Sequence, residues 1–221
     1  MVNAKVKNVG LDGKVTGLAG VFSLGATGAK ENDHVVIGVD FMLKKIKSAQ
    51  KFSRDAVALR KNEIDPSLQA FVLGEDGKVV SEAGFVYYGQ PKFQDGVLDL
   101  ATERAFMRHN AQLKLNLNAL SEHANRVRLV ATIDKAAQRQ HHAGMFLCIV
   151  FVICRYDMKP ITINAYSEFG PGQQGVVFGD LCLVDGNWQF EPNGVTSEGG
   201  LPALCADLGV EIKEESEGES K

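Results

Sequence analysis

Several features that define common protein classes are missing from this 221-residue sequence. Its longest apolar run, residues 143–154, has twelve residues, whereas a membrane helix needs about 20, and no apolar segment follows a basic N-terminus. We therefore predict no membrane span and no signal peptide. The four cysteines include no Cys-x-x-Cys pair, and their apolar neighbours predict buried, reduced thiols in a cytoplasmic protein.

An excess of one charge is also missing. The net charge is −3, and residues 211–221, with five Glu and two Lys, account for all of it, so the rest of the chain is neutral. A neutral body gives no electrostatic reason to bind nucleic acid. We predict a disordered acidic tail at residues 211–221. The one basic stretch, residues 41–62, has seven basic side chains against Asp55, and is either a solvated insert or a docking patch for an anionic partner.

Motifs of catalysis and cofactor binding are absent or lie in the wrong context. No G-x-S-x-G, Walker A or Cys/His nucleophile signature occurs, so we predict that the protein is not an enzyme. Residues 170–175 (GPGQQG) satisfy G-x-G-x-x-G, but a strand pattern follows them, which indicates a connecting loop. His141 and His142 lack a third ligand and predict a surface or turn pair. Cys148 and Cys154 are expected on one strand face, about 20 Å apart, in the core.

Short β-rich runs separated by turn residues dominate the chain from residue 69 onward. The predicted strands cover residues 69–73, 84–88, 113–117, 126–133, 145–156, 161–166, 175–184 and 188–190. Such closely spaced strands predict an all-β fold, a sandwich of two mostly antiparallel sheets. A short helix is expected at residues 119–125. A second, with Pro202 in its first turn and Gly209 at its end, is expected to pack against an edge or end of the sheets. We predict one domain over residues 1–210.

Three groups of residues carry a resemblance to a known family. They are Ala70-Phe71-Val72-Leu73-Gly74-Glu75-Asp76-Gly77-Lys78-Val79 with Phe85-Val86-Tyr87-Tyr88 and Gln90, then Val177-Phe178-Gly179-Asp180-Leu181, then Asp185-Gly186-Asn187-Trp188-Gln189-Phe190 followed by residues 199–210. The chain from about residue 35 to 210 resembles the TerD-domain proteins, the tellurium-resistance and general-stress family. The resemblance implies a cytoplasmic, calcium-binding β-sandwich without known enzymatic activity. It also implies a role in resistance to tellurite, to other stresses and to phage.

The resemblance also implies which side chains would hold calcium. Asp40 stands in Gly-Val-Asp where the family has Gly-Trp-Asp, Glu63 and Asp65 stand where it has Asp-x-Asp-x-Asp, and Asp134 resembles the aspartate of its Ile-Tyr-Asp-Ala. Calcium requires six to eight oxygen ligands, and here Ser67 replaces one carboxylate while Lys135 adds a positive charge.

The family's second glycine- and acid-rich loop also differs. It reads LDLATERAFMRHN at residues 98–110, where two acids are balanced by two arginines, so we predict that the second calcium site is absent. We expect a diverged member whose calcium binding is weak or absent.

These observations predict a non-catalytic stress-response protein of the tellurium-resistance type. It would act as a binding or scaffold protein with protein partners, possible examples being other tellurium-resistance or stress proteins. Two alternatives stay open from the sequence. One is a structural or assembly protein that uses the same sandwich without metal, and the other is a binder of a small ligand such as a nucleotide.

Overall fold

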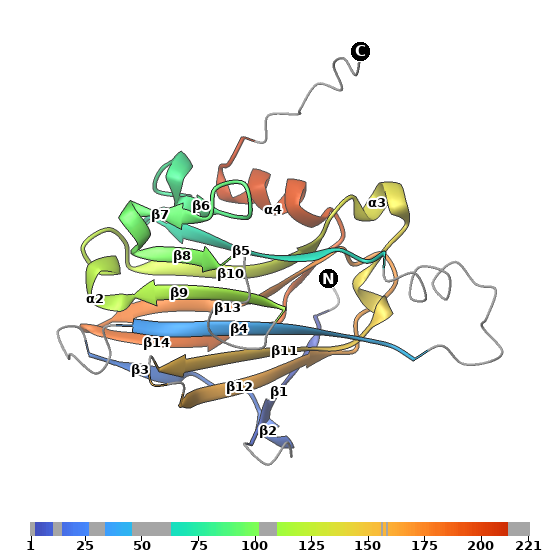
Figure 1. Cartoon of the computed structure of the whole chain (residues 1–221), viewed down its shortest axis with the longest axis horizontal. Coiled ribbons are helices and arrows are strands. Elements are labelled where there is room, and N and C mark those ends of the chain that lie inside the picture. The colour runs from blue at the N-terminus through green and yellow to red at the C-terminus, as the bar shows by residue number, and fades with distance from the viewer. Residues whose placement is uncertain are drawn as a thin grey trace.

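The structure is a computed structural model, and it describes residues 3–10, 15–26, 34–45, 63–101, 110–155, 157 and 159–211. Within these ranges the chain forms two antiparallel β-sheets, as Figure 1 shows. Side chains from both sheets form one apolar core. This confirms the predicted all-β sandwich. Residues 46–62 of the basic stretch and residues 212–221 of the acidic tail lie outside the described residues.

Sheet A has eight described strands. Across the sheet their order is β2 (Val15–Leu18), β1 (Lys5–Val9), β12 (Pro160–Ser167), β11 (Phe146–Arg155), β4 (His34–Leu43), β9 (Ala111–Asn116), β8 (Leu98–Ala101) and β7 (Lys92–Phe93). Strand β4 includes residues 41–43, so the basic stretch begins within sheet A. Its neighbours β11 and β9 come from much later in the chain, which makes the pairing strongly non-local.

Sheet B is the second layer. The order is β3 (Phe22–Ala26), β14 (Asn187–Pro192), β13 (Gly175–Val184), β10 (Arg126–Ile133), β5 (Pro66–Leu73) and β6 (Phe85–Val86), with β15 (Thr196–Ser197) beside β13. The bounds of β10 and β13 coincide with the predicted strands. The turn after β13 uses Asp185 and Gly186 with positive φ, the conformation that a two-residue hairpin needs.

The remaining elements are short. They are α2 (Leu117–Leu120), α3 (Ala136–Arg139), α4 (Gly200–Leu208), and the 3₁₀ turns η3 (Glu82–Gly84), η4 (Gln94–Gly96) and η5 (Ala143–Met145). Helix α2 begins two residues before the predicted helix because the Asn116 side chain accepts a hydrogen bond from the Ala119 N–H at 3.0 Å and caps it there. Within the described ranges, every helix is too short or too polar to cross a bilayer.

Two buried aromatic side chains join the sheets through hydrogen bonds. The Tyr166 hydroxyl, on β12 of sheet A, donates to the backbone carbonyl of Phe178 on β13 of sheet B. The Trp188 indole N–H, on β14 of sheet B, donates at 2.9 Å to the carbonyl of Leu117, the first residue of α2, directly after β9 of sheet A. Both side chains are fully buried, so each bond satisfies a polar group that would otherwise be costly in the core. Burial raises the pKa of Tyr166 well above its usual value, which keeps its hydroxyl a donor.

Helix α4 covers the outer face of sheet B. Its buried side chains form a second apolar cluster with outward-facing residues of the sheet, comprising Phe71, Leu73, Phe85, Val130, Val177, Leu204, Cys205 and Leu208. Figure 1 shows α4 lying along β5 and β10. The expectation that this helix packs against an edge or end of the sheets is therefore wrong. Alternate residues of β5, such as Phe71 and Leu73, are apolar on the outward side and need a cover.

The positions of the cysteines correct a second expectation. All four are free thiols, and three are buried, but Cys148 is half-exposed. Cys148 and Cys154 do share one face of β11, as predicted. That face is the outer one, because Ile149, Phe151 and Ile153 of the same strand fill the core between the sheets.

The turn after β5 holds the C-terminal end of α4. The Lys78 Nζ donates to the Asp207 carbonyl at 2.7 Å, and the Val79 N–H donates to the Leu208 carbonyl at 3.0 Å. Helix α4 ends at Gly209, whose φ of 77° is the left-handed conformation that glycine adopts readily. Lys78 therefore satisfies a carbonyl that α4 leaves without an intrahelical partner.

We expect Lys78→Met to lower the free energy of unfolding by about 0.5–1 kcal/mol, because the substitution removes the ammonium but keeps the aliphatic chain. For a chain of this size that corresponds to a fall in melting temperature of about 1–4 °C. Lys92→Met is the control, since Lys92 is an exposed lysine with only a 3.8 Å ion pair to Asp99. Equal melting temperatures for the two variants would show that the helix cap contributes nothing.

Candidate functional site at one end of the sandwich

The candidate site lies where several strands begin or end together. Strand β10 ends at Ile133, which pairs with Pro66 at the start of β5. Phe41, near the end of β4, lines one small cavity together with Pro66 and Ile133. Helix α3 follows β10 at the same end (Figure 1). The fold thus brings the neighbourhoods of all four predicted metal ligands to one end of the sandwich.

Asp65 and Asp134 are held together through the backbone. The Asp134 N–H donates to the Asp65 carbonyl at 2.8 Å. Asp65 is exposed and Asp134 is half-buried. The Asp134 carboxylate, however, faces a positive charge, because its Oδ2 lies 3.7 Å from Nη2 of Arg139 on α3.

Arg139 also lies near Glu63, another of the predicted calcium ligands. Within the described part of the chain, Glu63, Arg139 and His141 line an open depression at this end. A guanidinium is a permanent cation with five donors, so it neutralises carboxylates without displacing their protons. Arg139 thus supplies part of the positive charge that calcium supplies in a filled carboxylate site.

Asp40, the remaining predicted ligand, lies on β4 of sheet A. It points to the outer face of sheet A, where its Oδ1 accepts a hydrogen bond from the Asn110 N–H at 3.0 Å. The Asn110 side chain in turn accepts from the Phe41 N–H at 3.0 Å. This reciprocal pair ties the start of β9 to β4. Among the residues that the structure describes, no three His, Cys, Asp or Glu side chains are grouped closely enough to hold a metal ion.

Arg139 is the residue of this site that the sequence analysis did not identify. Its position in the sequence could have indicated it, because Arg139 follows Asp134 by five residues. A short helical turn between them brings the long Arg139 side chain back over the end of β10. From the sequence, only Lys135 was expected as a positive charge near Asp134. Lys135 instead has φ of 47° at the start of α3, so its contribution is the left-handed turn that redirects the chain.

The two histidines correct a further expectation. They lie between α3 and η5, so the predicted turn is right, but His141 is only 6% exposed and does not lie at the surface. The His141 N–H donates to the Ala136 carbonyl at 2.8 Å and closes the turn after α3. Residues 170–174 lie in the predicted connecting loop between β12 and β13, and Gly175 begins β13. In this loop the Gly170 N–H donates to the Gln173 side chain at 2.8 Å.

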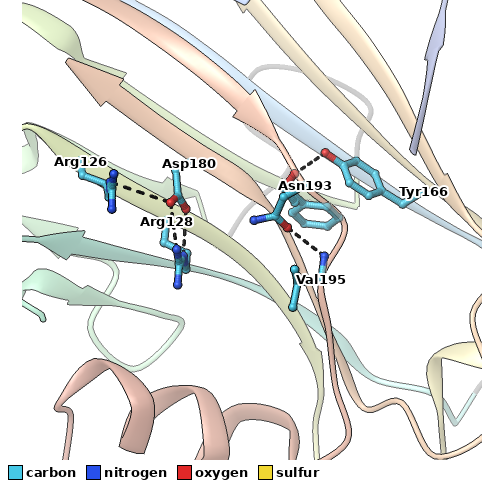
Figure 2. Close-up of polar contacts among 7 residues, drawn as sticks. Arg126, Arg128, Tyr166, Asp180, Asn193 and Val195 are labelled. Carbon is cyan, nitrogen blue, oxygen red and sulfur yellow. Dashed lines mark hydrogen bonds and ion pairs between the residues drawn. The ribbon is translucent and has the colours of Figure 1, made fainter. Parts of the chain in front are cut away.

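A separate charged group lies on the outer face of sheet B, and the sequence analysis did not identify it either. Arg128 donates to Asp180 through Nε and Nη2, both at 2.9 Å, across the paired strands β10 and β13. The Arg126 Nε lies 3.9 Å from the same carboxylate. Figure 2 shows both arginine side chains directed at Asp180. The hydrogen bonds to Asp180 raise the pKa of Arg128, in opposition to its partial burial. Because Asp180 is only 8% exposed, this pair is a structural link between two strands.

The fold defines a class, the β-sandwiches of two antiparallel sheets. A model of the TerD domain matches residues 22–208. The chain belongs to the TerD domain family.

Individual relatives agree with this assignment. The tellurium resistance protein TerD of Alcaligenes sp is 27% identical over 168 residues, covering 71% of this chain and 83% of that protein. General stress protein 16U of Bacillus subtilis (strain 168) is 23% identical over 155 residues, covering 68% and 80%. The crystal structure of the unknown-function protein SAV2460 matches with a TM-score of 0.50 and 20% identity, over 81% of this chain and 98% of that one. The last match concerns the fold alone. The relatives place this protein in a stress-response family.

Proposed function

We propose that this protein is a non-catalytic binding or scaffold protein of the cytoplasmic stress response, in which calcium binding has become weak or has been lost. The observation that carries the proposal is the Arg139 guanidinium 3.7 Å from Asp134, at the end of the sandwich where the family resemblance places calcium ligands. A fixed cation at this position repels a divalent ion and lowers the net negative charge of the loops. The names of the relatives refer to tellurium resistance and general stress, and we propose a role in stress resistance for this protein as well.

Calcium is expected to stabilise the protein little. If free calcium only equals Kd at millimolar concentration, the stabilisation is about 0.4 kcal/mol, which corresponds to about 1–2 °C in melting temperature. Thermal unfolding with millimolar calcium and with chelator measures this rise. A rise of several degrees that Asp65→Asn abolishes would contradict the proposal, because it would show a functional calcium site.

The variant Arg139→Gln tests whether the positive charge of Arg139 is what weakens calcium binding. It removes the positive charge beside Asp134 while it keeps a polar side chain of similar length. If Arg139 weakens the site, this variant gains a larger calcium-dependent rise than the unmodified protein. If both proteins respond equally, the ion pair with Asp134 is not what limits calcium binding.

A protein partner is the second part of the proposal, and the basic stretch at residues 41–62 is the segment proposed to bind it. Lys44 and Lys45 are exposed at its start, whereas Lys47 lies outside the described residues. Reversing all three charges to Glu is expected to leave the melting temperature unchanged and to abolish recovery of partners from stressed cells. Lys92→Glu with Lys159→Glu, at two other exposed lysines, is the control that should retain the partners.

The same triple variant has two other informative outcomes. A lower melting temperature, with a difference that salt reduces, would indicate that these lysines neutralise the protein's own acidic loops. Unchanged stability together with unchanged partner recovery would contradict both roles for the stretch.

A further inference from the structure

Two sulfur atoms from neighbouring strands meet on the outer face of sheet A. Cys148 on β11 is paired in register with Met42 on β4. The Cys148 thiol donates a hydrogen bond to the Met42 thioether, with Sγ and Sδ 3.5 Å apart. This contact is independent of the calcium-site residues, and nothing in the proposed function uses it.

The pair is accessible from solution. Met42 is 47% exposed, and Cys148 is half-buried rather than fully buried. The other three cysteines differ sharply, since Cys154, Cys182 and Cys205 are only 3%, 6% and 0% exposed. Cys148 is therefore the thiol most accessible to an ion in solution.

The chemistry of the two donors selects a class of ion. Thiolate and thioether sulfurs are soft ligands, which favour Cu(I) and similar soft monovalent ions over hard divalent ones. We propose that Cys148 and Met42 form a two-sulfur binding site for a soft monovalent cation such as Cu(I) or Ag(I). The ion takes the place of the proton that now lies between the two sulfurs.

The geometry fits an ion between the two sulfurs. With metal–sulfur bonds of about 2.3 Å, two sulfurs that share an ion lie no more than about 4.6 Å apart. The present separation of 3.5 Å is within this limit. The Met42 side chain is exposed and has three rotatable bonds, so it can widen the separation without moving the sheet.

The surroundings disfavour ions that require more ligands. Zn²⁺ takes four ligands and calcium takes six to eight, whereas two sulfurs are all that this pair offers. Asp40, two residues from Met42 on the same strand face, already accepts the Asn110 N–H at 3.0 Å. Across β11, the residue paired with Cys148 on β12 is Ser167, a hard hydroxyl donor.

The binding step balances as an exchange of one proton for one cation. Burial raises the pKa of the Cys148 thiol, so at neutral pH the free protein carries the proton. When the ion binds, the S–H bond breaks, a sulfur–metal bond forms, and the proton passes to the solvent. Met42 adds its thioether lone pair without losing a proton, and no atom changes its oxidation state.

Silver(I) nitrate in chloride-free buffer is a suitable probe, because Ag(I) is not redox-active under these conditions. The full chain, labelled with ¹³C at the methionine methyl groups, is titrated with one equivalent of Ag(I). Of the five methionine methyl signals, the one absent from Met42→Leu is expected to move, and one proton is expected to be released per ion. Competition with a small thiol is expected to show affinity at least about tenfold weaker for Met42→Leu than for the unmodified protein.

Three further results decide the proposal. Cys148→Ser should lose both the methionine shift and the proton release, whereas Cys154→Ala, on the same face of the same strand, should keep both. An unmoved Met42 signal with equal affinity for Met42→Leu would overturn the proposal, because the thiol would then bind alone. A Met42 signal that still moves in Cys148→Ser would overturn it as well. Far-ultraviolet circular dichroism and melting curves for each variant confirm that all of them are folded.

Discussion

Gly179→Ala is expected to destabilise the protein by about 3 kcal/mol or more, the largest effect of any single methyl group that we propose. A Cβ atom at this position would overlap the carbonyl oxygen of Glu191 and lie 2.8 Å from Cα of Pro192. Both neighbours are backbone atoms of β14, so the clash can be relieved only by separating β13 from β14. Thermal and denaturant unfolding of the purified variant measure the loss, unless the variant fails to accumulate in folded form.

Gly17→Ala separates the clash from the backbone strain. Gly17 has φ of 156°, close to the 152° of Gly179, but a Cβ there would meet no atom within 4 Å. We expect this control to cost about 1 kcal/mol or less. If the two variants were equally stable, close packing of β13 on β14 would not explain why glycine occupies position 179.

Trp188→Ala is expected to cost about 3–5 kcal/mol of the free energy of unfolding. The side chain is fully buried, belongs to the core shared by both sheets, and donates its indole N–H to the Leu117 carbonyl at 2.9 Å. The substitution therefore leaves a cavity and removes one donor from the Leu117 carbonyl, which keeps the hydrogen bond from the Ser121 N–H at 3.2 Å. Urea unfolding, followed by circular dichroism because the only tryptophan is lost, measures the change.

Trp188→Phe divides this cost into its two parts. It keeps an aromatic ring in the core but removes the N–H, so we expect a loss of about 1–3 kcal/mol. If Trp188→Phe were as stable as the unmodified protein, the bond to Leu117 would contribute nothing, and the predicted cost of Trp188→Ala would be due to packing alone.

The strands of the second half of the chain could be predicted from the sequence. In β10, inward Val127, Leu129 and Ala131 alternate with outward Arg126 and Arg128, so the period of two is visible. Strand β4 was not predicted as a strand, because residues 35–37 are apolar on both faces of the sheet. Val36, which faces away from the shared core, is only 2% exposed, and such a strand shows no alternation.

The candidate site could be predicted only in part. The acidic residues Asp65 and Asp134 were identified, and the backbone places them together. The contribution of Arg139 was not identified, because the position of its guanidinium depends on the left-handed turn at Lys135 that begins α3. The hydrogen bond between Trp188 and Leu117 joins residues 71 positions apart, and no local pattern reports a contact of that range.

The position of α4 in the chain has a consequence for how the protein is made. Because α4 follows every described strand in sequence, a ribosome synthesises β5 and β10, which carry Phe71, Leu73 and Val130, well before the helix that covers them. In the nascent chain these apolar side chains therefore stay uncovered until α4 leaves the exit tunnel. During that interval they form a natural binding surface for a chaperone, and a chain cut before residue 200 would keep them permanently exposed.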